Sequence, residues 1–194
     1  MDIRIARGED LPQILAIYAP YVLNTTHTFE YTVPTMDAFA LRFREITARF
    51  PWLVWEENGK ILGYAYGSLP FERAAYAWCA EVSVYLDPAA RRRGIGSALY
   101  AALEQILRKQ GYQVVYAIIT GENTDSLAFH RHQGYRETAS FSGCGYKFGH
   151  WLDVVWMEKR LQFVENPQKA PVSFPELVEN DRYDADILAI LSLS

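Results

Sequence analysis

A strand, a long helix and a second strand follow one another between residues 82 and 120, and this succession constrains the fold more than any other feature. The strand VSVYL ends before Pro88, the run from 94 to 110 repeats apolar residues at helical spacing, and 113–120 has the composition of a buried strand. Strands joined by a helical crossover pair in parallel, with the helix on one face of the sheet. The sequence therefore predicts an α/β fold built around a β-α-β unit.

Shorter periodic segments on either side of this unit predict further strands and helices. The pair Asn58-Gly59 lies between two apolar runs, which is typical of a β-hairpin. We expect strands around Ile3 and Ile5, at 52–57, 60–69 and 76–86, and twice between Gly134 and Arg160, with helices at 11–23, 36–49 and 124–132. Antiparallel hairpins that lead into a β-α-β crossover predict a mixed central sheet with helices on both faces.

The chain is long enough for one domain with a substantial core, and its composition changes near residue 162. We assign residues 1–161 to the main domain. Residues 162–194 contain three prolines in a polar stretch and then the short apolar segment DADILAILSLS. We expect this C-terminal appendage, whose role the sequence does not reveal, to include a helix that docks on the core or on a partner subunit.

Charge, cysteine content and hydropathy argue against several classes of function. The net charge is −4 and the pI about 5.6, whereas a dedicated nucleic-acid binder usually carries a basic surface. Two cysteines without a CxxC pair, and an N-terminus without an apolar signal segment, favour a reducing, cytoplasmic location. No apolar run reaches the roughly 20 residues that span a membrane. His130 and His132 lack i,i+4 spacing and a third ligand, so we expect no metal site.

The segment AARRRGIGSALY, residues 89–100, combines three arginines with two glycines at the start of the long helix. Glycines let the backbone approach a ligand closely, and the first-turn amides of a helix bind anions. The segment lacks the G-K-[ST] of a Walker A loop, and Leu99 stands where a dinucleotide-binding fingerprint has its last glycine. These residues therefore predict a cradle for the pyrophosphate of a nucleotide cofactor.

Two motifs around this loop resemble the GNAT acetyltransferase superfamily. Residues 91–96, RRRGIG, are similar to the [QR]-x-x-G-x-[GA] signature that binds the pyrophosphate of acetyl-CoA, and residues 123–135, NTDSLAFHRHQGY, are similar to the second coenzyme A segment. The stretches RAAYAWCAEVSVYLDP (73–88) and KFGHWLDV (147–154) narrow the resemblance to the phosphinothricin acetyltransferase family. The resemblance covers about residues 2 to 160. It implies a GNAT fold, with a mixed central sheet and a splayed β-α-β core that binds acetyl-CoA.

The resemblance also implies which residues contact acetyl-CoA, the co-substrate. They lie on the strand before the loop, in the loop and in the second segment: Val82, Val84, Arg91, Arg92, Arg93, Gly94, Ile95, Gly96, Ser97, Asn123, Ser126 and His130. We expect the backbone amide of Val84 to donate to the oxyanion. Arg92 either faces water or reaches the ribose phosphate, and Asn123 either binds the pantetheine or organises its own loop.

Acetyl transfer needs a base for the acceptor amine, and the resemblance implies that Glu81 takes this role. A carboxylate between Ala80 and Val82 in an apolar strand is unusual for a residue that merely faces water. An unperturbed glutamate, with a pKa of about 4.3, is a poor base for an α-amine. Burial must therefore raise this pKa, or an ordered water must act in between. His130 either protonates the thiolate or packs on coenzyme A without transferring a proton.

Arg73 and Tyr76 come shortly before Glu81, and an arginine can hold a carboxylate or phosphinate in bidentate fashion. With Phe29, whose surroundings resemble the family's entrance segment, they form the expected acceptor site. We expect direct acetyl transfer, in a ternary complex, to a small amino-acid-like amine such as phosphinothricin, methionine sulfoximine or methionine sulfone. The alternatives are a polyamine or protein N-terminus as acceptor, and a non-catalytic coenzyme A sensor. The resemblance further implies a homodimer.

Overall fold

The structure is a computed structural model that describes residues 2–166 and 169–179 together with residues 187, 189 and 191. Its strands are β1 (Asp2–Ile5), β2 (Trp52–Glu57), β3 (Lys60–Ser68), β4 (Cys79–Leu86), β5 (Val114–Thr120), β6 (Arg136–Lys147) and β7 (His150–Arg160). Its α-helices are α1 (Leu11–Asn24), α2 (Met36–Thr47), α3 (Ile95–Gln110), α4 (Thr124–His132) and α5 (Phe174–Glu179).

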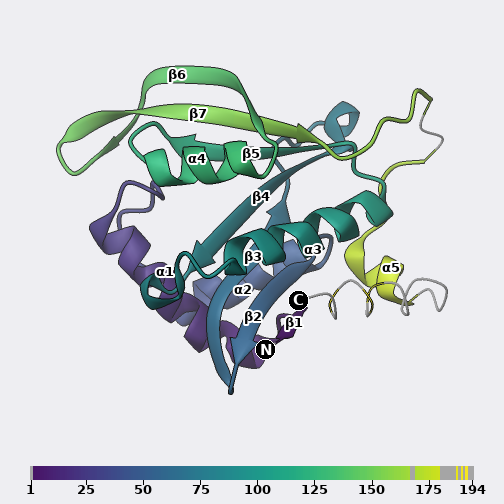
Figure 1. Ribbon diagram of the computed structural model, residues 1–194, viewed down its shortest axis with the longest axis horizontal. Coiled ribbons are helices and arrows are strands. Elements are labelled where there is room, and N and C mark those ends of the chain that lie inside the picture. Colours follow the sequence, from purple (N-terminus) through teal and green to yellow (C-terminus); the bar gives the residue numbers. More distant parts are fainter. Residues whose placement is uncertain (1, 167–168, 180–186, 188, 190, 192–194) are drawn as a thin grey trace.

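The strands form one seven-stranded sheet in the order β1-β2-β3-β4-β5-β7-β6 (Figure 1). The neighbours β4 and β5 pair in parallel, and the other neighbours in this order pair antiparallel. The parallel pair is connected by α3, because a short turn cannot join parallel strands. The predicted α/β fold with a mixed central sheet is confirmed.

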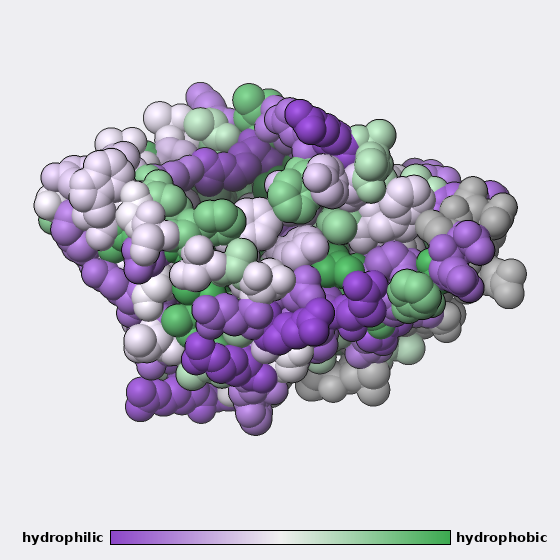
Figure 2. Space-filling model, turned by 90° about the horizontal axis from the view of Figure 1, so that it is seen from above, coloured by the Kyte–Doolittle hydropathy of each residue, from purple (hydrophilic) through white to green (hydrophobic). Residues whose placement is uncertain are grey.

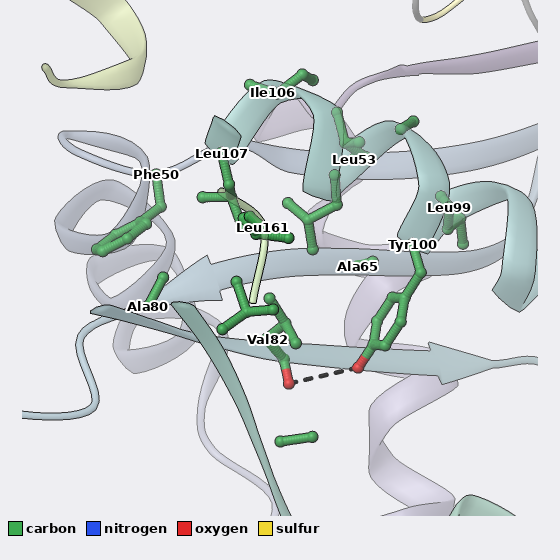
Figure 3. Packing of buried hydrophobic residues seen from close by; sticks show 14 of the residues in the cluster. Phe50, Leu53, Ala65, Ala80, Val82, Leu99, Tyr100, Ile106, Leu107 and Leu161 are labelled. Carbon is green, nitrogen blue, oxygen red and sulfur yellow. Dashed lines mark hydrogen bonds between the residues drawn. The ribbon is translucent and has the colours of Figure 1, made fainter. Parts of the chain in front are cut away.

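Helices cover both faces of the sheet (Figure 1). On one face α3 packs its apolar stripe, which includes Leu99 and Leu107, against the strands, as Figure 3 shows in close-up. On the other face α1 and α2 bury a second cluster around Trp52. Leu53 belongs to the first cluster and Val54 to the second, because successive residues of a strand point to opposite faces.

The two parallel strands stay together over three residue pairs, the last of which joins Glu81 to Tyr116. Beyond this pair they diverge, and Figure 1 shows the opening between β4 and β5. Pairing of β4 with β3 continues to Leu86, and pairing of β5 with β7 continues to Thr120. Each strand is therefore held on its outer edge while a gap opens between them.

Most predicted element boundaries agree with the structure within two residues, and the largest difference lies before β4. This strand begins at Cys79 rather than at residue 76. Residues 74–76 instead form a 3-10 turn, in which the Ala77 amide donates to the Ala74 carbonyl oxygen. The alternating pattern of the sequence continues through this turn and does not mark it.

The described residues after β7 pack on the main core. Four of them are buried in the same cluster as α3: Leu161, Phe174, Leu177 and Ile187. The Val172 amide donates to the Gln110 carbonyl oxygen over 2.9 Å, which ties the segment before α5 to the end of α3. Of the apolar segment DADILAILSLS, all but residues 187, 189 and 191 lie outside the described residues.

Candidate active site

A cavity of about 470 Å³ occupies the gap between β4 and β5, and we call it the splay cavity. The diverging strands line it through residues 82–86 and 117–119, and α4 closes one side. Eight of the predicted acetyl-CoA residues line it: Val82, Val84, Arg91, Arg92, Gly96, Asn123, Ser126 and His130. The structure therefore brings the two sequence motifs together around one space.

The loop before α3 has the geometry of an anion site. Arg91 and Arg92 line the splay cavity from this loop. Gly94 is the N-cap of α3 with a φ of 81°, a left-handed conformation that glycine adopts without strain. No side chain at the N-cap accepts from the first-turn amides, so these donors remain available to a ligand. Two cations and helix-start amides together fit a pyrophosphate.

Arg91 is oriented by Tyr21 of α1. Arg91 Nη2 donates to Tyr21 Oη over 3.1 Å, and the guanidinium lies over the ring, 5.5 Å from its centroid. Tyr21 Oη in turn donates to the Leu86 carbonyl oxygen over 2.7 Å, which links α1, β4 and the arginine loop. Helical spacing predicts Tyr21 only as a core residue. The apolar stripe of a helix does not show that one of its tyrosines also orients an arginine.

Four predicted acetyl-CoA residues do not line the splay cavity: Arg93, Gly94, Ile95 and Ser97. Arg93 Nη2 donates instead to both carboxylate oxygens of Glu57, over 2.8 and 2.9 Å. Ile95 is buried in the core, and Ser97 Oγ accepts from Gln133. Successive side chains at a helix start point about 100° apart, so they cannot all face one ligand. What these residues can offer acetyl-CoA is their backbone amides.

Glu81 is the last residue of β4 that pairs with β5. Ala80 and Val82 are buried on the α3 side, so strand alternation turns Glu81 to the opposite face. Within the described part of the chain its carboxyl has no hydrogen-bond or ion-pair partner. Burial raises the pKa of this carboxyl to about 7. Such a group changes its protonation state near neutral pH, as a general base for an amine requires.

Backbone alternation directs the Val84 amide toward the splay cavity. The Asp87 amide donates to the Leu62 carbonyl oxygen on β3, so the amides of residues 86 and 84 point away from β3. The Leu86 amide accordingly donates to Tyr21 Oη, over 3.4 Å, on the side away from β3. The Val84 amide points to the same side, where the gap is open and an oxyanion donor is expected.

His130 is buried, and both of its ring nitrogens have partners. Nδ1 lies 2.7 Å from the Ser126 carbonyl oxygen, and Nε2 lies 3.0 Å from Tyr100 Oη. A carbonyl can only accept, so Nδ1 carries the proton and Nε2 accepts the Tyr100 hydroxyl. Burial lowers the pKa of His130, so the ring is neutral at neutral pH.

Tyr100 is a functional candidate that the sequence did not single out. It lines the splay cavity, and its hydroxyl lies 3.4 Å from the Val82 carbonyl oxygen (Figure 3). Burial raises the pKa of Tyr100 well above its ordinary value, so the phenol stays protonated. Tyr100 sits beside Leu99 and Leu103 on the apolar part of α3, where the helical pattern predicts only packing.

The three predicted acceptor residues lie outside the splay cavity. Arg73 and Tyr76 are exposed in the loop between β3 and β4, and Tyr76 packs on Phe71 with ring centroids 4.5 Å apart. Phe29 lies in the loop after α1 and covers Gly145 of β6 so closely that a Cβ there would clash with the ring. Tyr76 contacts Phe71, which stacks on Trp156 of β7.

Lys147 anchors the loop that follows α1. Its side chain is 1% exposed, and Nζ donates to the carbonyl oxygens of Val22, Thr25 and Thr28, each over 2.8 Å. Three donors thus meet three acceptors at the C-terminal end of a helix, where a cation is favoured. The sequence places Lys147 in a family-like stretch, but the pattern does not reveal that the side chain reaches back to α1.

The family of this chain follows from a match to a known protein domain. Residues 3–156 match the model of the acetyltransferase (GNAT) domain. The chain belongs to the GNAT acetyltransferase family. It is an acetyl-CoA-dependent N-acetyltransferase, as the sequence motifs predicted.

The acetyltransferase is similar to characterised relatives over most of its length. It is 37% identical to the phosphinothricin N-acetyltransferase of Alcaligenes faecalis over 163 residues, 82% of each chain. It is 34% identical to the L-methionine sulfoximine/L-methionine sulfone acetyltransferase of Salmonella typhimurium, over 83% of this chain and 95% of that one. The crystal structure of a phosphinothricin acetyltransferase from Sinorhizobium meliloti in complex with acetyl-CoA matches with a TM-score of 0.81 at 36% identity, over 90% of this chain and 95% of that one. The resemblance to the phosphinothricin acetyltransferase family is confirmed.

Three further properties of the described residues concern metal binding, free thiols and membrane-spanning helices. Among them, no group of three or more His, Cys, Asp or Glu side chains could hold a metal ion. Cys79 and Cys144 are both free thiols. No helix in the described part of the chain is long and apolar enough to cross a bilayer.

Proposed function

We propose that this acetyltransferase acetylates the amine of a small amino-acid-like acceptor, such as phosphinothricin, methionine sulfoximine or methionine sulfone, by direct attack in a ternary complex. The observation that carries the proposal is Glu81, a partly buried carboxyl without a described partner, placed where β4 and β5 separate. The names of relatives that are 37% and 34% identical support this class of acceptor.

Residues around the splay cavity hold the co-substrate in this proposal. Arg91, Arg92 and the amides at the start of α3 bind the pyrophosphate, and the gap between β4 and β5 receives the pantetheine arm. Asn123 accepts from the Ser126 amide over 3.2 Å, so its side chain caps α4 and organises its own loop. Acetyl-CoA, when bound, supplies the acetyl group as a thioester.

Glu81 and the Val84 amide act on the two reacting groups. Above a pH of about 7 Glu81 is ionised, and it takes the proton that the acceptor nitrogen loses as it bonds to the acetyl carbon. The Val84 amide donates to the acetyl oxygen, on which negative charge develops. Because β4 is paired with β3 along its other edge, this donor is in position before the reaction begins.

Tyr100 returns a proton to the sulfur when the carbon–sulfur bond breaks. The Tyr100 hydroxyl lines the splay cavity, and rotation about its C–O bond turns its proton from His130 Nε2 toward the sulfur, whereas His130 is neutral and has its single proton on Nδ1, facing Ser126. In this proposal His130 orients Tyr100 and does not itself protonate the thiolate. Tyr100 then regains a proton from solvent and Glu81 releases one, so the protons balance over a turnover.

The test is the release of free thiol from acetyl-CoA with a panel of amino acids, their analogues, polyamines and peptides. Acetylation of amino acids or their analogues, with polyamines and peptides inactive, is the expected result. Turnover of polyamines or peptides in their place would show that the acceptor class is wrong.

We also propose that the enzyme is a homodimer. Exposed aromatic side chains gather at the turn of the β6–β7 hairpin: Tyr146, Phe148 and Trp151, the last of which is 69% exposed. This end of the molecule lies at the left of Figure 1, and in Figure 2 pale side chains of intermediate hydropathy cover it. Large exposed aromatic side chains are typical of interaction surfaces. Light scattering should give twice the chain mass, and a monomer would contradict the proposal.

A further inference from the structure

A cluster of aromatic rings lies on the face of the sheet that carries Glu81, and the mechanism above does not use it. The cluster consists of Phe71, Tyr76, Tyr116 and Trp156, and we call it the aromatic patch. Glu81 and Tyr116 are paired directly across β4 and β5, so their side chains leave the same face of the sheet. The patch therefore begins beside the proposed base.

The outer strand β7 extends this face. Val155 and Met157 are buried on the α3 side, so Trp156 between them points to the side of Glu81. The rings of Trp156 and Tyr116 have centroids 5.8 Å apart. The apolar cluster under α1 and α2 includes residues of β2 and β3 but none of the described residues of β5 or β7, so those helices leave these rings uncovered.

The loop between β3 and β4 folds over these rings. Phe71 stacks on Trp156 with a centroid distance of 5.5 Å and an interplanar angle of 26°, and it meets the Tyr116 ring edge-on at 6.1 Å. None of the four rings is fully buried, and Tyr76 is 44% exposed. The rings stack on one another and still leave apolar surface that a bound side chain can cover.

Arg73 lies in the same loop, between Phe71 and Tyr76 in sequence. It is exposed, and within the described part of the chain its guanidinium has no hydrogen-bond or ion-pair partner. It is also the only cation in residues 69–78. Residues 69–78 also contain Glu72, so this loop offers one cation to the acceptor carboxylate and none to a second acidic group.

We propose that the acceptor is an α-amino acid with a large apolar side chain, aromatic above all. Its side chain stacks on the aromatic patch, Arg73 holds its carboxylate, and Glu81 receives the proton from its α-amine. This inference rests on the proposed N-acetyltransferase function and narrows its acceptor class. It favours phenylalanine, tryptophan and methionine derivatives over acceptors with an acidic side chain.

The first test compares acceptors at saturating acetyl-CoA, by thiol release with L-phenylalanine, L-tryptophan, L-methionine, L-glutamate and phosphinothricin. We expect kcat/KM for L-phenylalanine and L-tryptophan to exceed that for the two acidic acceptors by about tenfold or more, because stacking favours the aromatic side chains. A higher kcat/KM for the acidic acceptors would overturn this inference and leave the proposed function intact. Failure to acetylate any amino acid would instead contradict the proposed function.

The second test removes the rings one at a time. Trp156→Ala and Phe71→Ala should each raise KM for L-phenylalanine about tenfold, with KM for acetyl-CoA unchanged. Phe71 lies on a loop, so its variant keeps the test available if Trp156→Ala does not fold. Phe163→Ala, which removes an exposed ring outside the patch, is the matched control and should leave both KM values unchanged. An unchanged preference for L-phenylalanine over L-glutamate in Phe71→Ala would overturn the inference.

Discussion

The region where β4 and β5 separate partly buries the carboxyl of Glu81, and the region where the β6–β7 hairpin turns buries the ammonium of Lys147. Lys147 has all three of its donors paired with carbonyl oxygens. Glu81 has no described partner, and its pKa is raised to about 7. Removing a charge from water is unfavourable in both regions, but only at Lys147 do hydrogen bonds compensate for it.

The difference distinguishes a side chain that holds the fold from one that is available for the proposed chemistry. The hydrogen bonds of Lys147 join β6 to the end of α1, and a group with every donor satisfied has nothing left to offer a substrate. A partly buried carboxyl without a described partner keeps a protonation equilibrium near neutral pH, which is typical of active sites. Three experiments test this contrast between Glu81 and Lys147.

Glu81→Gln, which keeps the shape of the side chain and removes the proposed base, should have the greatest effect, and this effect is on catalysis. We expect kcat to fall by about 10²- to 10⁴-fold, with little change in KM for acetyl-CoA. In the wild-type enzyme kcat/KM should rise with pH through an apparent pKa of about 7, and the variant should lose this dependence. Glu137→Gln, at an exposed position of β6, is the control. A variant that retains both kcat and the pH profile would remove Glu81 from the role of base.

A smaller effect, on stability, is expected from Lys147→Met. The three carbonyl oxygens at the end of α1 lose their donor, so the free energy of unfolding should decrease by about 3 kcal/mol, measured by urea denaturation. Lys60→Met is the control, because the exposed ion pair of Lys60 with Asp87 should contribute less than about 1 kcal/mol. Equal losses in the two variants would show that Lys147 is no more structural than a surface lysine.

The smallest effect is the pH dependence of stability that Glu81 imposes. Its pKa is about 7 in the folded protein against an ordinary 4.5, so between these pH values the folded state binds more protons at this site than the unfolded state. Stability from this group therefore falls as pH rises through that window. Relative to Glu81→Gln, the wild type should lose on the order of 1 to 3 kcal/mol between pH 4 and pH 8. Urea denaturation at a series of pH values measures this, and a constant difference would contradict it.

Much of the fold could be predicted because each element carries its own periodic signal. The long helix α3 and the buried strand β5 are recognisable without their neighbours. The splay is different, because the number of residues over which β4 and β5 stay paired depends on how each packs with a separate neighbour, β3 or β7. The residue pattern of a single strand does not determine this number of paired residues.

The residues of the candidate site also differ in how well the sequence alone predicts them. Glu81 and Arg91 could be predicted, because they stand at fixed places in recognisable stretches. Tyr100 and Lys147 received no role, since their partners are distant in the sequence and their own surroundings look like ordinary core and strand. The side-chain direction of Arg93 also required the structure, because it depends on the helix start that follows and on Glu57 of β2.

The described segment after β7 limits where this chain can be truncated. The family match ends at residue 156, yet Phe174 and Leu177 are buried beneath the far end of α3, and the Gln110 side chain donates to the Val172 carbonyl oxygen. A protein trimmed directly after β7, at Arg160, would keep every residue of the splay cavity and the whole sheet, and would still expose an apolar surface at the end of α3. Aggregation through this surface would lower the yield of such a protein without any change to the residues of the active site.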